Sequence, residues 1–450
     1  MATVLEAHGV EVAFTSSLAV LEDVDLRLTP GFYGLVGANG AGKTTLLRVL
    51  AGDLAPSRGS IRMSPSGATV AYCAQEDDRA MAASPGERKR AQLDAALATR
   101  PDVLLLDEPT NHLDGAARAR LVATLRRFRG ICILVSHDRE LLDTLPNAII
   151  RVHDRRATLY PGNYEEASRL WRMERDAEVD AHRRAKGEVR AIERRLADAR
   201  AKHAAADRAR SARTRMKNKN DHDAKSMGAK VVAGWAEGRA GREVGVARAD
   251  LARAAAAVPR IERDRTVGAN VFASWARAAT PILFHLDEPS ITVTRDDRVR
   301  IAGPNGAGKT TLIRALLAAS HVTDHVLYLP QELLEDDVAA LTRDVAALDP
   351  ETRGRVLSVF GALGSAPERI ARRGAGDASL SPGEARKLAL AFGLGRHAWA
   401  LVLDEPTNHL DLPTIERLER ALEAYPGCIV LVTHDEAFAA TCTTRTIDLP

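Results

Sequence analysis

The nine residues Leu106–Asp114, with the sequence LDEPTNHLD, recur letter for letter at Leu403–Asp411. An identity of this length is too long for coincidence, so the chain holds two copies of one structural unit. An apolar run leads into each copy, and each copy contains an acidic pair, Asp107–Glu108 in the first and Asp404–Glu405 in the second. A buried strand that ends in two carboxylates suits a Mg²⁺-nucleotide site, because the first carboxylate can hold the metal while the second orients or deprotonates a water molecule.

A glycine-rich segment of the pattern G-x-x-x-x-G-K-T lies upstream of each acidic pair, between a strand pattern and an apolar helical pattern. This setting identifies a P-loop, whose backbone N–H groups wrap phosphates at a helix N-terminus. The lysine is expected to reach the β- and γ-phosphates, and the threonine after it to hold Mg²⁺ together with the aspartate of the acidic pair. A glycine-rich turn that binds no nucleotide is the alternative, and the lysine and threonine argue against it. The predicted phosphate-binding residues are Gly37, Asn39, Gly40, Gly42, Lys43, Thr44 and Thr45, and Gly303, Asn305, Gly306, Gly308, Lys309, Thr310 and Thr311, and the predicted Mg²⁺ ligands are Thr44, Asp107, Thr310 and Asp404.

With these motifs the chain resembles the ATP-binding-cassette (ABC) ATPases, whose other motifs can be matched one by one. A glutamine follows each P-loop, and a histidine follows each acidic pair. The resemblance implies that the glutamine contacts Mg²⁺ and the attacking water, that the histidine contacts the γ-phosphate, and that the glutamate of the acidic pair is the general base. Alone, each glutamine could be an ordinary loop residue and each histidine structural, but the histidine follows the aspartate by 30 positions in both copies. The predicted catalytic residues are Gln75, Glu108 and His137 in the first copy and Gln331, Glu405 and His434 in the second.

A signature loop of the same family is matched by the tetrapeptide SPGE, which begins at Ser84 and again at Ser381. Its serine and glycine, Ser84 with Gly86 and Ser381 with Gly383, stand at a predicted helix start, where backbone N–H groups can bind an anion. The usual family form is LSGGQ, and the proline is tolerated in the first turn of a helix. A plain N-capped helix is the alternative, but the signature serine precedes the aspartate of the acidic pair by 23 positions in both copies.

The two copies differ in what surrounds these motifs. Ser381 follows Gln331 by 50 positions, which leaves room for a helical subdomain, whereas Ser84 follows Gln75 by only 9. In the family that subdomain presents the signature loop to the opposite nucleotide. Phe14 is the candidate for stacking on adenine in the first copy, and Phe284 in the second. The segment Leu286–Ser290, LDEPS, lacks the NHLD continuation, so we interpret it as part of a leading strand.

From Glu165 onward the composition shifts to alanine, arginine and glutamate, and two apolar seams with 3/4 spacing are separated by a polar break. This pattern predicts an antiparallel helical hairpin that ends at Pro259. Its tip, Arg200–Lys230, holds 10 basic and 3 acidic residues. A solvated helix face is the alternative, but contact with RNA phosphates fits the concentrated charge. The seam positions are Val189, Ile192, Leu196 and Ala199, then Val244, Ala247, Leu251, Ala254 and Val258.

Bulk properties narrow the classes of function. A net charge of +3 means that a nucleic-acid contact must be local, and 4% aromatic residues weigh against a base-stacking RNA surface. The four cysteines form no C-x-x-C pair, which favours small buried residues over metal ligands. Because no signal pattern and no run of 18 apolar residues is found, we expect a cytoplasmic protein without an integral membrane segment.

The sequence thus predicts an α/β protein with two P-loop NTPase domains of the ABC type, joined by an antiparallel α-helical hairpin. The expected domains are residues 1–164, with the helical subdomain largely missing, residues 165–260 as the basic hairpin, and residues 261–450. This arrangement resembles the ABC-F proteins, soluble ATPases that bind the tRNA exit site of the ribosome. The long linker and the SPGE signature are most similar to members that protect ribosomes against antibiotics. A duplicated ATP-binding subunit of an ABC transporter is the competing class.

The resemblance implies ATP and Mg²⁺ as cofactors, and it implies rRNA and tRNA near the exit and peptidyl sites as partners of Arg200–Lys230. It also implies a monomer whose two cassettes sandwich two ATP molecules. Because the first copy lacks room for the helical subdomain, we expect site one to be the more competent. Site one combines Lys43, Thr44, Gln75, Asp107, Glu108 and His137 with Ser381 and Gly383, and site two combines Lys309, Thr310, Gln331, Asp404, Glu405 and His434 with Ser84 and Gly86.

Overall fold

The protein is described from a computed structural model, which covers residues 3–15, 18–74, 85–110, 115–210, 227–259, 269–272, 274–304, 306–320, 322–371 and 380–450. The chain divides into two compact units. The first unit, Met1–Ala167 with Asp264–Pro450, contains both copies of the repeated motif. We call the part up to Ala167 the first cassette and the part from Asp264 onward the second cassette. The second unit is Ser168–Arg263.

The first cassette is built on a six-stranded sheet of order β5-β6-β7-β3-β8-β9, parallel except for β9. The strands β6 and β7 are buried along their whole length, which their unbroken apolar sequences VLLLD and ICILV require of a parallel sheet covered on both faces. A separate antiparallel sheet has the order β2-β1-β4. The strands are β1 (Val4–Thr15), β2 (Leu18–Leu28), β3 (Gly31–Gly37), β4 (Arg58–Ser64), β5 (Val70–Cys73), β6 (Val103–Asp107), β7 (Ile131–Val135), β8 (Ala148–His153) and β9 (Arg156–Pro161), and the helices are α1 (Lys43–Ala51), α2 (Pro85–Ala98), α3 (Gly115–Leu125) and α4 (Arg139–Thr144).

The second cassette repeats this topology in a five-stranded parallel sheet of order β13-β14-β15-β12-β16. This strand order corresponds, position by position, to β5-β6-β7-β3-β8 of the first cassette. The predicted α/β fold with two equivalent domains is therefore confirmed. Residue 286 ends β10 and residues 287–290 form the turn to β11, so only the first residue of LDEPS belongs to a strand. The elements are β10 (Ile282–Leu286), β11 (Ile291–Thr294), β12 (Arg298–Ala302), β13 (Val326–Leu329), β14 (Ala400–Asp404), β15 (Cys428–Val432), β16 (Arg445–Asp448), α9 (Lys309–Ala318), α14 (Leu412–Ala424) and α15 (Glu436–Cys442), with short 3₁₀ turns at Ala269–Phe272 and Thr323–His325.

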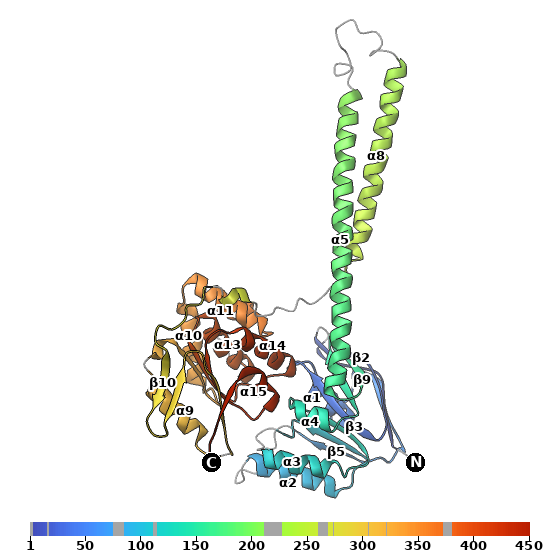
Figure 1. Ribbon diagram of the computed structural model, residues 1–450. Helices are drawn as coiled ribbons and strands as arrows, with labels where there is room; N and C mark the ends of the chain where they lie inside the picture. The colour runs from blue at the N-terminus through green and yellow to red at the C-terminus, as the bar shows by residue number, and fades with distance from the viewer. Residues whose placement is uncertain are drawn as a thin grey trace. The chain divides into compact units, whose positions relative to one another are not determined.

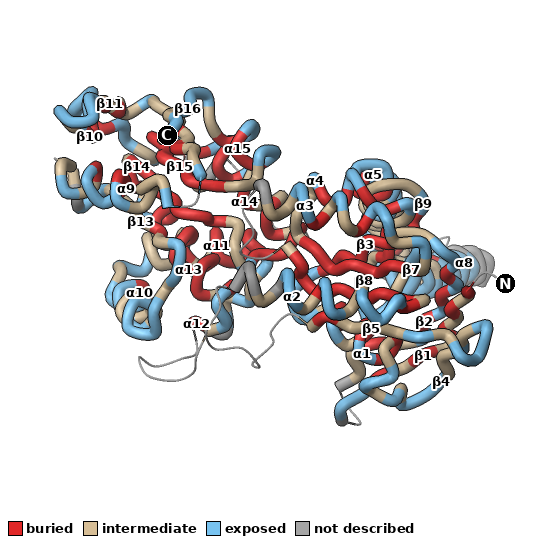
Figure 2. Tube along the Cα trace, turned by 90° about the horizontal axis from the view of Figure 1, so that it is seen from below, coloured by how far each residue is buried: buried red, intermediate tan, exposed pale blue. Residues whose placement is uncertain are grey.

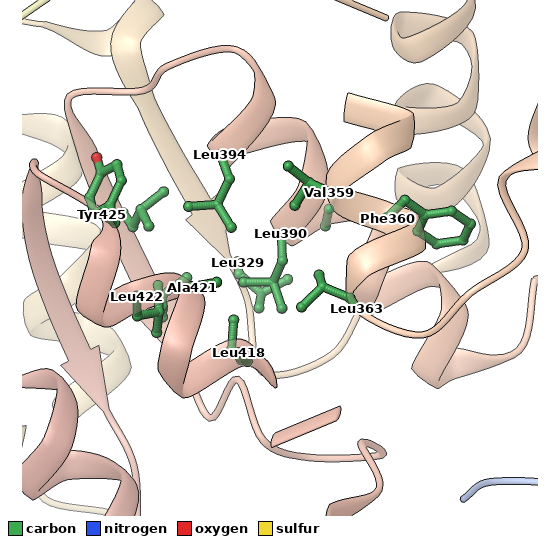
Figure 3. Packing of buried hydrophobic residues seen from close by; sticks show 14 of the residues in the cluster. Leu329, Val359, Phe360, Leu363, Leu390, Leu394, Leu418, Ala421, Leu422 and Tyr425 are labelled. Carbon is green, nitrogen blue, oxygen red and sulfur yellow. The ribbon is translucent and has the colours of Figure 1, made fainter. Parts of the chain in front are cut away.

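Helices between β13 and the end of the signature segment form a subdomain in the second cassette. They are α10 (Glu335–Ala347), α11 (Pro350–Ala362), α12 (Pro367–Ala371) and α13 (Pro382–Gly395). Val359, Phe360 and Leu390 are buried in the cluster that joins α11 and α13 to the sheet (Figure 3). From β13 to α13 there are 52 residues, whereas 11 separate β5 from α2 in the first cassette. The central strands of both sheets are buried (Figure 2), and all four cysteines are buried, as predicted.

The second unit consists largely of two long helices, α5 (Tyr164–Arg210) and α8 (Met227–Ala256) (Figure 1). They run antiparallel, because His182 lies 2.7 Å from the carbonyl of Pro259 while His203 lies beside Gly241. The predicted hairpin is therefore confirmed, and its seam residues are buried or half-buried. The turn of the predicted basic tip, residues 211–226, lies outside the described residues. Among the helices that the structure describes, none combines the length and apolarity needed to span a membrane.

Candidate nucleotide-binding sites

Both P-loops have the backbone geometry of an anion-binding loop. Gly40 and Gly306 adopt φ angles of 77° and 84°, a left-handed conformation that strains residues with a Cβ atom. Gly42 and Gly308 are the N-cap residues of α1 and α9, and as glycines they offer no side chain to cap the first N–H groups of these helices. A helix start of this kind, with the positive end of the helix dipole, favours a phosphate group.

The P-loop lysines bend back over their own loops in the same way. The Lys43 ammonium donates to the carbonyl of Gly37 at 2.9 Å, and the Lys309 ammonium donates to the carbonyl of Gly303 at 2.8 Å. Burial lowers the pKa of Lys43, and the carboxylates of Glu108, Asp411 and Asp107 oppose that shift. The negative charge of these carboxylates would repel the phosphates of a nucleotide. A bound divalent cation would offset that charge, so that Lys43 could attract the phosphates.

The predicted magnesium ligands lie together in both cassettes. The Thr44 hydroxyl donates to Asp107 at 2.8 Å, and the Thr310 hydroxyl donates to Asp404 at 3.0 Å. No group of three or more His, Cys, Asp or Glu side chains that could hold a metal occurs among the described residues. One carboxylate and one hydroxyl are the donor set expected for Mg²⁺ that takes its remaining ligands from phosphates and water, so these residues fit the ion.

The glutamate after each of these aspartates faces a histidine from the neighbouring strand. His137 Nε2 lies 3.0 Å from Glu108 Oε1, and His434 Nε2 lies 3.6 Å from Glu405 Oε1. Both glutamates have positive φ angles, 49° for Glu108 and 48° for Glu405, so each strand bends sharply where the acidic pair begins to leave the sheet. Burial lowers the pKa of His137 to about 3 and raises that of Glu405 to about 7, and a raised glutamate pKa suits a general base.

The start of the signature helix α13 lies beside the P-loop of the first cassette. Ser381 caps this helix by accepting a hydrogen bond from the N–H of Glu384 at 3.3 Å. A Cβ atom added to Gly383 would lie 3.6 Å from the Asn39 amide nitrogen. Asn39 also donates from its main chain to Asp411 at 2.7 Å. The structure thus places Gly383 of the second cassette beside Asn39 of the first P-loop.

The contacts above do not include all of the predicted site residues. Gln75, Ser84 and Asn305 lie outside the described residues, and Gly86 is the second residue of α2. The threonines Thr45 and Thr311 occupy the third position of their helices. Gln331 lies in the turn after β13. Its carbonyl accepts a hydrogen bond from Arg386, a residue that the sequence motifs did not identify.

The prediction that Phe284 stacks on adenine is wrong, because this side chain is fully buried in the core of the second cassette. The candidate in the first cassette, Phe14, is 59% exposed and precedes the last residue pair of the β1–β2 hairpin. The residue at the same point of the β10–β11 hairpin is His285, which is half-exposed and bonds to Thr292 at 2.9 Å. The sequence alone does not distinguish His285 from Phe284, because strand alternation decides which of two adjacent aromatic side chains faces outward.

Comparison with known proteins agrees with this geometry. The ABC transporter family matches residues 21–82 and 286–408. The ribosome protection protein VmlR of Bacillus subtilis is 29% identical, over 93% of this chain and 82% of its own length. The ATP-binding protein Uup of Caulobacter vibrioides is 30% identical, over 96% of this chain and 74% of its own. A solved structure of an archaeal ribosome recycling factor, aABCE1, bound to the stalk protein aP1, has 17% identity and a TM-score of 0.58 over 98% of this chain and 87% of its own, which shows a similar fold.

Proposed function

The chain belongs to the ABC-F family of ATP-binding-cassette proteins, and from this premise we propose that it binds and hydrolyses ATP at two sites and acts on the ribosome. The observation that carries the first part is the duplicated arrangement of five side chains. In each cassette the lysine folds over its loop, the threonine bonds to the aspartate, and the glutamate faces the histidine. Two independent copies of the same geometry support one shared chemistry.

The proposed roles follow from the position of each side chain. In site one, Lys43 binds the β- and γ-phosphates, and Thr44 with Asp107 would hold Mg²⁺, which neutralises charge on the phosphates when bound. Glu108 accepts the proton of the attacking water, and His137, uncharged because its pKa is about 3, contacts the γ-phosphate as a hydrogen-bond partner. Ser381 and Gly383 of the signature helix close this site from the second cassette. Lys309, Thr310, Gln331, Asp404, Glu405 and His434 take the same roles in site two.

The second part of the proposal concerns the ribosome. It is supported by the helical hairpin, by the concentration of basic residues in Arg200–Lys230, and by the similarity to VmlR, which is named a ribosome protection protein. Phosphate contacts of a cationic hairpin give affinity for RNA without reading its sequence. We propose that the hairpin contacts rRNA and tRNA in the cytoplasm, and that the result is protection of the ribosome against an antibiotic.

Co-sedimentation with ribosomes tests the proposal. The double variant Glu108→Gln with Glu405→Gln keeps the phosphate-binding residues and lacks both general bases, so ATP should stay bound and hold the cassettes closed. We expect this variant to pellet with ribosomes in ATP but not in ADP, and the pelleted fraction to fall as salt rises. Failure to bind ATP, or pelleting with ribosomes in no nucleotide state, contradicts the proposal. Co-purification with a membrane complex instead supports the transporter-subunit alternative.

A further inference from the structure

The largest fully buried side chain of the described residues is charged. Arg386, in the second turn of the signature helix α13, is 2% exposed. A guanidinium group taken out of water is strongly unfavourable unless its N–H groups are bonded. Its position therefore needs an explanation, because an alanine or leucine would fill a helix interior without this cost.

The guanidinium donates to main-chain carbonyls on two loops. One nitrogen donates to the carbonyl of Glu405 at 2.7 Å, and the other donates to the carbonyl of Gln331 and, at 3.5 Å, to that of Pro330. These loops carry the general base and the water-contacting glutamine proposed for site two. The planar fork of an arginine can span two acceptors at once, so one side chain sets the spacing between both catalytic segments.

The start of the same helix, one turn before Arg386, belongs to the opposite site. Ser381 and Gly383 are the residues proposed to close site one, and Gly383 lies beside Asn39 of the first P-loop. From Ser381 to Arg386 is about 7.5 Å along a helix axis, at 1.5 Å per residue. A capping box between Ser381 and Glu384 keeps the first turn of this helix intact. A shift of the helix start is therefore transmitted to Arg386 as a rigid displacement.

We propose that Arg386 is a positioning residue that couples nucleotide binding at site one to catalysis at site two. When ATP at site one draws the start of α13 toward the first P-loop, the guanidinium sets the backbone of Glu405 and Gln331 in their reactive arrangement. This proposal rests on the proposed function, because it requires ATP hydrolysis at site two. A displacement near 1 Å of catalytic groups can change a rate about 100-fold, so a small helix shift is sufficient.

We expect this coupling to act on site two and not on site one, because the two signature segments differ in sequence at the position of Arg386. The residue of the first cassette that matches Arg386 in the SPGE segment is Lys89, since both follow their signature serine by five positions. A lysine ammonium is a compact donor without the planar fork, so it does not hold two carbonyl groups at a set spacing. The sequence of the first cassette thus provides no arginine at this position.

A double-mutant cycle read only at site two tests this coupling. Glu108→Gln keeps ATP at site one without hydrolysis, and Lys43→Ala removes ATP from site one. Each of these backgrounds is combined with Arg386→Lys and with Arg386→Met, which removes the donors at a similar volume. The measured quantities are the single-turnover rate of ATP hydrolysis and the KM for ATP at site two. Arg355→Met is the matched control, because Arg355 also bonds to a main-chain carbonyl of α13, that of Gly395 at 3.2 Å, away from the P-loop.

We expect Lys43→Ala to slow site two about 10-fold or more relative to Glu108→Gln when Arg386 is intact. With Arg386→Lys the same comparison should give less than a threefold difference, because the coupling is already lost. Arg386→Lys should lower the single-turnover rate 10- to 100-fold in the Glu108→Gln background and change KM less than threefold, whereas Arg355→Met changes neither.

The cycle also separates this proposal from the proposed function. Absence of ATP binding and hydrolysis by the unaltered chain would overturn the proposed function. Hydrolysis at site two that responds to Lys43→Ala equally with arginine or lysine at position 386 overturns the coupling alone. If Arg386→Met does not fold, as judged by circular dichroism and a thermal midpoint, the charge-retaining Arg386→Lys variant still decides between these outcomes.

Discussion

The two cassettes have the same catalytic groups but hold them differently. In the first, the residue after the His137–Asp138 pair is Arg139, which forms a bidentate bridge to Glu419 on α14 of the second cassette, at 2.7 and 3.0 Å. In the second, the corresponding residue is Glu436, which bonds to Arg300 of its own β12. The two cassettes thus share the same set of proposed catalytic residues. They differ in what holds the segment after the histidine, which is bonded to the other cassette in the first and to its own cassette in the second.

Loss of the general base gives the largest expected difference between the cassettes. In the proposed function the signature helix of the second cassette closes site one, so Glu108→Gln should lower steady-state ATP hydrolysis about 100-fold or more. Glu405→Gln should lower it only a few-fold, because site two depends on the shortened first cassette. Initial rates of phosphate release from the two purified variants measure this, and equal losses would show that the sites are equivalent.

Breaking the bridge between the cassettes is expected to destabilise the chain by about 2 kcal/mol. Arg139 and Glu419 have side chains only 17% and 12% exposed, so Arg139→Ala leaves a mostly buried carboxylate without its partner. Urea unfolding followed by circular dichroism measures the change. Arg183→Ala is the control, since its bridge to Asp180 is exposed and should contribute less than about 0.5 kcal/mol. A midpoint for Arg139→Ala that matches this control contradicts a structural role for the bridge.

Acidity should affect site two over a range near neutrality. Burial raises the pKa of Glu405 to about 7, so the ionised form that accepts a proton is the minor form at pH 6 and the major form at pH 8. With Glu108→Gln in place, single-turnover hydrolysis at site two should rise roughly tenfold across this range. The wild-type P-loop residues remain unchanged, so ATP binding serves as the control. A rate that stays constant from pH 6 to pH 8 shows that this carboxyl group is not the base.

The smallest expected effects concern adenine. If Phe14 and His285 stack on the base at sites one and two, replacing either with alanine should weaken ATP binding about 2- to 12-fold, from a stacking energy of about 0.5–1.5 kcal/mol. GTP and ATP affinities measured with fluorescent analogues in Lys309→Ala or Lys43→Ala backgrounds assign each effect to one site. Unchanged affinity after His285→Ala would leave site two without a described aromatic partner for the base.

Local motifs made much of this molecule predictable. The repeated acidic strand, the P-loops and the helical seams each depend on residues close in sequence, where periodicity and spacing carry the information. The contacts of Arg139 and Arg386 could not be predicted in this way. Arg139 and Glu419 are 280 positions apart, and Arg386 binds main-chain carbonyls, which every residue type has. Phe284 and His285 were not distinguishable from the sequence, because their order on the strand does not reveal which face the core covers.

The attachment of the segment after His137 to the other cassette has a consequence for the order of events. When the cassettes separate, the bridge from Arg139 to Glu419 pulls on the segment that carries His137, whereas Arg300 on β12 holds Glu436, which follows His434, within the second cassette. We therefore expect the first site to open and to release its product before the second.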